Sequence, residues 1–164
     1  SEYAAFAVQD AAAGFVTLPQ YLDAPLPPGL LGKVLLGGRP DHVAVRRSGE
    51  SIEAIRVDDF KYSAATSGLK GQLTDSFQIP VYGHLAALVL GCTSGVRIEG
   101  RYLLLRSPEN PVVSQTIDAA VLDEVRERIE ALVDKAASGR LQPRPADAQR
   151  CFDCDYRRLC RLYG

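Results

Sequence analysis

The chain of 164 residues is long enough for one domain with a buried core, and 46% hydrophobic and 24% charged residues are ordinary for a globular protein. The sequence contains no apolar run of about eighteen residues, so we predict no membrane-spanning helix and no membrane partner. No basic-then-apolar segment typical of a secretory signal opens the chain. Because the chain begins at Ser1 and has no Met, we expect an excised or processed domain.

The net charge of −1 does not by itself indicate a nucleic-acid-binding protein, but the basic residues are unevenly distributed. Between Arg140 and Gly164, six Arg residues are opposed by three Asp residues, which gives a local balance of +3. Such a basic tail can contact phosphates, and it can equally be a solvated surface that is partly paired. The charge distribution leaves both interpretations open.

Three parts are predicted along the chain: an N-terminal helical or loop segment over residues 1–30, a core over residues 31–138, and a Cys- and Arg-rich tail over residues 139–164. An Ala-rich stretch, Ala4–Gly14, opens the first part. The Pro-rich stretch Asp23–Gly29 is expected to be a connection, because Pro and Gly interrupt regular structure.

The core begins with three runs of β-forming residues, Lys33–Gly37, His42–Arg47 and Ile52–Tyr62. Between the last two runs, Ser48-Gly49-Glu50 has the composition of a short hairpin turn. We therefore predict that the three runs form an antiparallel meander.

A helix, a strand and a second helix are predicted to complete the core. The apolar segment Asp75–Leu90 is typical of a helix, with Pro80 in or near its first turn, where a missing N–H costs least. Val96–Arg106 is predicted to be a strand, and Ser114–Ala137 a helix that ends before Gly139. This order predicts an α/β fold in which a mixed central sheet is flanked by helices.

The segment Asp58-Asp59-Phe60-Lys61 lies on the last of the three predicted strands. Because side chains alternate between faces, Asp59 and Lys61 project together, while Asp58 and Phe60 point the other way. A carboxylate can bind a hard cation such as Mg²⁺, and a neighbouring ammonium can orient the attacking water and offset phosphate charge. Asp41, at an edge of the same meander, is the candidate for a second carboxylate. Alone, such a charged strand face is more often a solvated surface.

Gln78 and Tyr82 lie four residues apart on the predicted helix and would share a face. They could hydrogen-bond a phosphate, a nucleobase or each other, or they could be a helix cap and a half-buried tyrosine. The two histidines, His42 and His84, are expected to be structural or solvent-facing rather than catalytic.

The chain has four Cys residues, three of them in a Cys-x₂-Cys-x₅-Cys pattern: Cys92, Cys151, Cys154 and Cys160. Without a secretory signal, the clustered thiols favour a zinc or iron–sulfur site over disulfides and predict a cytoplasmic location. Cys92 is expected to be a small buried apolar residue. A zinc site completed by His84 or Cys92 is the competing interpretation.

In chain order, these motifs resemble the nuclease domain of the RecB family in the PD-(D/E)XK superfamily, which includes AddB-type helicase–nuclease subunits and CRISPR-associated exonucleases. The resemblance extends from about Gly37 to Arg161. It rests on Gly38-Arg39-Pro40-Asp41, Asp59-Phe60-Lys61, Gln78-Ile79-Pro80-Val81-Tyr82 and the three tail cysteines.

The resemblance implies metal-dependent hydrolysis of DNA, exonuclease-like and on single-stranded or unwound ends, in repair, recombination or CRISPR-type processing. Asp41 and Asp59 would bind Mg²⁺ or Mn²⁺, with the Phe60 carbonyl as a further ligand. Lys61 would act at the water and the scissile phosphate.

The resemblance also implies roles for the remaining motifs. Gln78 and Tyr82 would lie near the DNA. The tail cysteines would hold a [4Fe–4S] cluster together with one Cys far upstream: Cys151, Cys154 and Cys160. A helicase domain or subunit would be the protein partner.

The sequence departs from the family pattern in its upstream part. Family members usually carry an upstream His, and often a Glu, that complete the metal site, whereas here the upstream acids are Glu2, Asp10 and Asp23 and there is no upstream His or Cys. His42 stands where the family often has Arg. Two alternatives therefore stay open: an inactive nuclease-fold DNA-binding module of a helicase complex, and a structural metal or iron–sulfur interaction domain.

Overall fold

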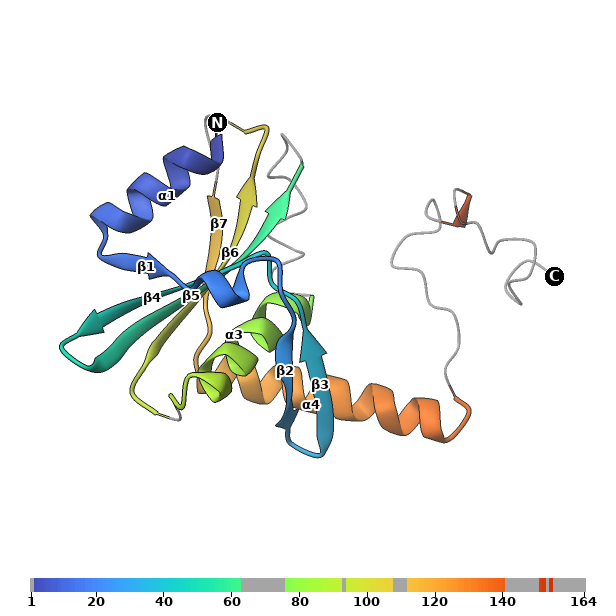
Figure 1. Ribbon diagram of the computed structural model, residues 1–164. Helices are drawn as coiled ribbons and strands as arrows, with labels where there is room; N and C mark the ends of the chain where they lie inside the picture. The colour runs from blue at the N-terminus through green and yellow to red at the C-terminus, as the bar shows by residue number, and fades with distance from the viewer. Residues whose placement is uncertain are drawn as a thin grey trace. The chain divides into compact units, whose positions relative to one another are not determined.

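A computed structural model of the protein describes residues 2–62, 76–92, 94–107, 112–140, 151–152 and 154 (Figure 1). The chain divides into two compact units, residues 1–127 and residues 128–164. The fold described here is that of the first unit. The three-part division expected from the sequence stays a prediction.

A five-stranded sheet in the order β1-β4-β5-β6-β7 forms the centre of the first unit. Strands β5 and β6 are parallel, and the other neighbours are antiparallel. Helix α3 lies between β5 and β6 in the chain, as a crossover between parallel neighbours requires. The mixed α/β fold expected from the sequence is thereby confirmed. The bounds are β1 (Phe15–Thr17), β4 (His42–Ser48), β5 (Ser51–Lys61), α3 (Gln78–Val89), β6 (Arg97–Leu104) and β7 (Val112–Thr116).

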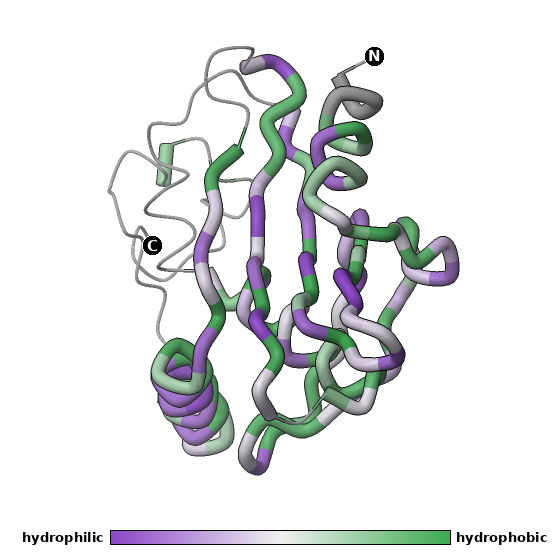
Figure 2. Tube along the Cα trace, turned by 90° about the vertical axis from the view of Figure 1, so that its left-hand side faces the viewer, coloured by the Kyte–Doolittle hydropathy of each residue, from purple (hydrophilic) through white to green (hydrophobic). Residues whose placement is uncertain are grey.

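Both faces of this sheet are covered. Three consecutive residues of β4, Val43, Ala44 and Val45, are buried, which requires cover on both sides because successive side chains point to opposite faces. In Figure 1, α1 (Glu2–Ala12) lies on one side of the sheet and α3 on the other. Figure 2 shows hydrophilic residues among the hydrophobic ones along the central strands, so the covered sheet also holds polar groups.

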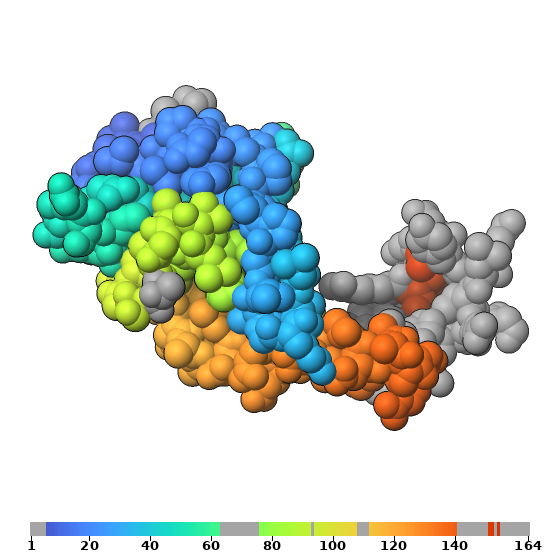
Figure 3. All heavy atoms as spheres, turned by 60° about the horizontal axis from the view of Figure 1, so that its bottom comes forward, coloured from blue at the N-terminus to red at the C-terminus, as the bar shows by residue number. Residues whose placement is uncertain are grey.

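The predicted three-stranded meander is wrong in its first strand. Strands β4 and β5 form the expected hairpin, but β3 (Val34–Gly38) pairs with β2 (Leu26–Leu31) in a separate two-stranded sheet. The Pro-rich stretch expected to be a connection therefore forms part of β2. The pairing of β2 with β3 is irregular between Leu26 and Gly29, and Pro27 and Pro28 lie at this irregularity. Proline has no backbone N–H to donate, and an irregularity is where a strand tolerates that loss. Figure 3 shows this hairpin beside α3.

The second long helix begins later than predicted. Residues 112–116 form β7, and α4 (Ala119–Ala137) follows, so the expected start at Ser114 is wrong. The carboxylate of Asp118 accepts a hydrogen bond from the Val121 N–H at 3.0 Å and caps the true helix start. In the described part of the chain, no helix is both long and apolar enough to cross a membrane.

Helix α3 packs closely against the sheet because glycines line its contacts. A Cβ atom on Gly100 of β6 would lie 2.0 Å from Cγ2 of Ile79, and a Cβ on Gly83 would lie 2.5 Å from Cδ1 of Ile117. Ile79 is fully buried beside Gln78, the first residue of α3. The glycine contact therefore sets where the N-terminal turn of α3 lies above the central strands.

Candidate active site

Asp59 is the centre of a group of polar side chains near the C-terminal end of β5. Its Oδ1 accepts a hydrogen bond from Nε2 of Gln78 at 2.7 Å, and its Oδ2 lies 2.5 Å from Nζ of Lys61. Nε2 of Gln78 also donates to the Tyr82 hydroxyl at 3.2 Å. Four residues selected from two separate motifs are thus joined by direct contacts between a strand and a helix.

Asp41 joins this group from the loop before β4. Its Oδ2 accepts a hydrogen bond from the Phe60 N–H at 2.5 Å, and its own N–H donates to the Asp58 carbonyl at 3.1 Å. Asp41 is close enough to Asp59 that its charge raises the pKa of Asp59. The hairpin pairing of β4 with β5 therefore brings together two carboxylates that are distant in sequence.

Burial raises the pKa of Asp59 above its usual range, and the charge of Asp41 adds to this, although Lys61 and Gln78 oppose it. Asp59 Oδ2 is buried, and it forms an ion pair with the ammonium of Lys61. A buried carboxylate oxygen whose partner is an ammonium is suited to positive charge. Two neighbouring carboxylates form the all-oxygen donor set that Mg²⁺ and Mn²⁺ prefer.

The Gln78 amide and the Gly38 backbone help to define this group. Gln78 holds Oδ1 of Asp59, and Oδ2 faces the ammonium of Lys61. A Cβ atom on Gly38 would lie 2.6 Å from the Tyr82 ring, so glycine at this position leaves room for that ring. The expected sharing of one helix face by Gln78 and Tyr82 is confirmed. The Phe60 carbonyl as a ligand stays a prediction.

A second polar group lies behind the first, on the opposite face of the sheet. Arg101 of β6 donates to both carboxylate oxygens of Asp58 at 2.7 Å and to those of Asp10 at 2.9 and 2.8 Å. Nδ1 of His42 lies 2.7 Å from Oδ2 of Asp58. All four side chains are buried. We call Asp10, His42, Asp58 and Arg101 the buried ion network.

Both carboxylates of the buried ion network are paired with an arginine. Burial opposes the ionisation of Asp58, but hydrogen bonds from Arg101 and His42 outweigh it and lower the pKa of Asp58. Burial likewise opposes the charge of Arg101, whose pKa is nevertheless raised by Asp58 and Asp10. Ligand atoms of Asp10, His42 and Asp58 lie within 4.8 Å of one another, a spacing that would suit a metal ion. Because Arg101 already binds both carboxylates, we interpret the group as an ion network.

The network neighbours the candidate reaction centre along the backbone. His42 follows Asp41, Asp58 precedes Asp59, and His42 and Asp58 face each other in the β4–β5 register. His42 is buried rather than solvent-facing, and its structural role stays a prediction. The roles of Asp10 and Arg101 were not predicted. The two residues are ninety-one positions apart, and no sequence motif connects them.

Comparison with known proteins identifies the family. The sequence profile of the PD-(D/E)XK nuclease superfamily matches residues 2–161. The chain belongs to the PD-(D/E)XK nuclease superfamily. Membership indicates a metal-dependent nuclease, and the superfamily is the one that the motifs resemble.

Other comparisons add little to this family assignment. A solved structure described as the crystal structure of SSO0001 is similar over 99% of this chain and 67% of its own, with 17% sequence identity and a TM-score of 0.40. No match to this PD-(D/E)XK chain was found among curated proteins.

The cysteines of this PD-(D/E)XK protein are only partly described. In the second unit, Cys151 is half-buried and Cys154 is exposed, and both are free thiols. Cys160 lies outside the described residues. Cys92 is half-buried rather than fully buried, and its Sγ lies 3.6 Å from the Leu90 carbonyl. The cluster expected at the three tail cysteines stays a prediction.

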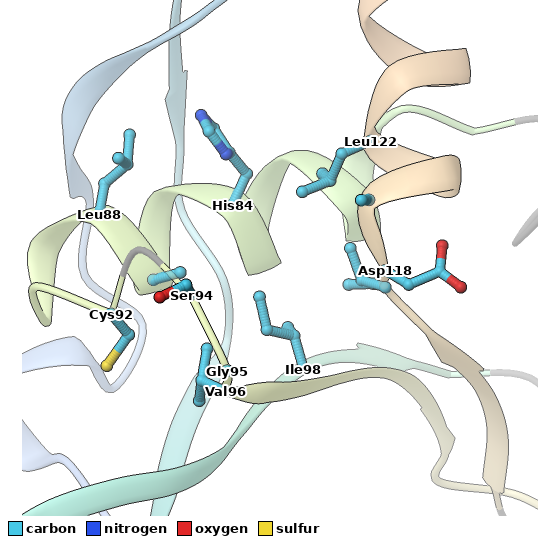
Figure 4. Close-up of a pocket in the computed structure, with 12 residues that line it drawn as sticks. His84, Leu88, Cys92, Ser94, Gly95, Val96, Ile98, Asp118 and Leu122 are labelled. Atoms are coloured by element: carbon cyan, nitrogen blue, oxygen red, sulfur yellow. The ribbon is translucent and has the colours of Figure 1, made fainter.

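A pocket of about 320 Å³ lies at the C-terminal half of α3 (Figure 4). His84 and Leu88 of α3, Cys92, and Ile98 of β6 contribute to its lining. His84 also contacts the Leu30 carbonyl through Nε2 at 2.7 Å. None of the side chains around Asp59 lines this pocket, so it is separate from the candidate PD-(D/E)XK reaction centre.

Proposed function

We propose that the chain hydrolyses phosphodiester bonds of DNA with Mg²⁺ or Mn²⁺, and that Asp41, Asp59 and Lys61 form its reaction centre. One observation supports this most strongly: residues of three separate motifs meet around the buried carboxylate of Asp59. A solvated strand face, the alternative left open by the sequence, would not place Asp59 among buried residues.

Each residue has a distinct task in this proposal. Asp41 and Asp59 hold the cation, and Gln78 orients Asp59 through Oδ1. When bound, the cation supplies positive charge to the phosphate and lowers the pKa of the attacking water. Lys61 orients the water and offsets the negative charge that develops on the phosphate. Tyr82 holds the Gln78 amide in place.

The finer parts of the proposal rest on the RecB-like motifs. They are exonuclease-like action on single-stranded or unwound ends, a role in DNA repair, recombination or CRISPR-type processing, a helicase partner and a cytoplasmic location. A [4Fe–4S] cluster at Cys151, Cys154 and Cys160 belongs to the same set.

Degradation of end-labelled single-stranded DNA in the presence of Mn²⁺ tests the proposal. We expect the parent chain to cleave, and Lys61→Ala to lower the rate by about 10²–10³-fold, the usual cost of losing one electrostatic element of a reaction centre. Lys135→Ala, which removes an exposed lysine of α4, is the matched control and should leave the rate unchanged. Equal urea midpoints would show that all three proteins are folded. Full activity in folded Lys61→Ala would refute the assignment of Lys61.

One observation favours a second candidate, an inactive nuclease-fold module that binds DNA. Asp10 of α1 is held by Arg101 on the opposite face of the sheet from Asp59. It therefore does not supply the upstream metal ligand usual in the resembling family. DNA binding without metal-dependent cleavage by the parent chain would support this candidate.

A further inference from the structure

An exposed aromatic residue directly follows the proposed catalytic lysine. Tyr62 is 79% exposed, and the guanidinium carbon of Arg106 lies 5.2 Å from the centre of its ring. The Leu105 N–H donates to the Lys61 carbonyl at 3.0 Å, which continues the parallel pairing of β5 with β6 beyond the last ladder residues. Tyr62 and Arg106 are thus held side by side where two neighbouring parallel strands end.

The position of this pair matters because it shares a sheet edge with the reaction centre. In open sheets, ligands bind outside the carboxyl ends of parallel strands, and Asp59 and Lys61 lie near that end of β5. Another tyrosine nearby has a different environment: Tyr102 of β6 is 1% exposed, with Nζ of Lys61 4.8 Å from its ring centre. Tyr102 is therefore a core residue, whereas burial does not explain an aromatic side chain at Tyr62.

An exposed ring with a cation beside it is suited to stacking on a nucleobase. Proteins that bind single strands place aromatic side chains next to a basic surface, so that bases stack on the rings while cations attract the phosphates. Arg106 supplies the cation and forms a cation–π contact with the Tyr62 ring. Bases within a duplex already stack on each other. The exposed Tyr62 ring would therefore bind unpaired nucleotides in preference to paired ones.

We propose that Tyr62, together with Arg106, forms a stacking subsite for an unpaired nucleobase adjacent to the phosphate at Lys61. The subsite makes single-stranded DNA the preferred substrate. The position of the scissile phosphate rests on the proposed function, whereas the stacking platform rests on the exposure of Tyr62 and its contact with Arg106.

Binding without metal tests the subsite independently of cleavage. The probe is a fluorescein-labelled oligothymidylate of about 12 nucleotides, within the usual site size for single-strand binding, titrated with the full chain in EDTA. We expect Tyr62→Ala to weaken binding by roughly 5- to 100-fold, as loss of one stacked base does. Tyr62→Phe keeps the ring and should retain the affinity of the parent.

Two comparisons separate stacking from a general surface effect. Leu35→Ala removes another large exposed side chain, from β3, and should leave the affinity unchanged. A duplex of the same length should bind the parent and Tyr62→Ala equally. Unchanged binding of the single strand by Tyr62→Ala would overturn the subsite, and so would an equal loss in Tyr62→Phe.

Kinetics with Mn²⁺ distinguish failure of the subsite from failure of the proposed function. If the parent cleaves, Tyr62→Ala should raise KM for single-stranded DNA and leave kcat largely intact. Cleavage with an unchanged KM would overturn the subsite and leave the nuclease proposal standing. A parent that does not cleave, but whose single-strand binding depends on Tyr62, would overturn the nuclease proposal and support the subsite.

Discussion

Two adjacent acids of β5, Asp58 and Asp59, have different surroundings and opposite pKa shifts. Because neighbouring residues of β5 point to opposite faces, Asp58 meets Arg101, which helps to lower its pKa. Asp59 faces α3, where burial and the charge of Asp41 raise its pKa. The first acid is paired with Arg101 and His42 within the fold, while the second lies beside Asp41 and Lys61. This difference makes Asp59, and not Asp58, the candidate for binding a cation.

At the same residue scale, Gln78 is expected to control metal affinity. Gln78→Ala removes the donor that holds Asp59 Oδ1, so a cation would have to order the carboxylate itself. Loss of such a supporting contact typically weakens metal affinity or activity by about 10–100-fold. We predict a rise of that size in the Mn²⁺ concentration that gives half-maximal cleavage. Gln9→Ala, at an exposed position of α1, is the control, and the prediction fails if both variants titrate alike.

At the scale of elements, the proposed reaction centre depends on how closely α3 approaches β6. Gly100→Ala would place a Cβ 2.0 Å from Ile79, so the helix must move away from the strand. We predict a loss of about 1–3 kcal/mol in the free energy of unfolding, the usual cost of overpacking, measured by urea denaturation. Cleavage should also fall, because α3 carries Gln78.

Gly37 provides the matched control for this element. A Cβ at Gly37 of β3 would have no atom within 4 Å, so Gly37→Ala should change stability little. If both alanine variants were as stable as the parent, close packing would not be what positions α3.

At the scale of the whole first unit, the buried ion network links α1 to three strands of the sheet. Arg101→Met would leave the carboxylates of Asp10 and Asp58 without their shared partner. Removing one partner of a buried ion pair typically costs about 3–5 kcal/mol, and we predict a loss of this size in urea denaturation. Arg126→Ala breaks an exposed pair with Asp123 and should have little effect. An equally small effect of Arg101→Met would show that the network does not stabilise the fold.

Much of the candidate site could be predicted from short segments of the sequence. The alternation of side chains along β5 placed Asp59 and Lys61 together, and the helical spacing placed Gln78 beside Tyr82, because both patterns follow from the geometry of a single element. The predicted ranges of β4, β5, α3 and β6 were close to the observed ones for the same reason. Residues 112–116 were assigned to a helix, however, because their strand pairing with β6 is a contact between elements.

The amino-acid sequence by itself determined the mixed α/β fold, the superfamily and the order of the nuclease motifs. Only the tertiary structure decided that β3 pairs with β2, that Asp10 meets Arg101, and that Tyr62 stands exposed next to Arg106. The physical reason is the range of the interactions. Periodicity and motif spacing are properties of short segments, whereas pairing, burial and ion networks depend on which distant segments the folded chain brings together.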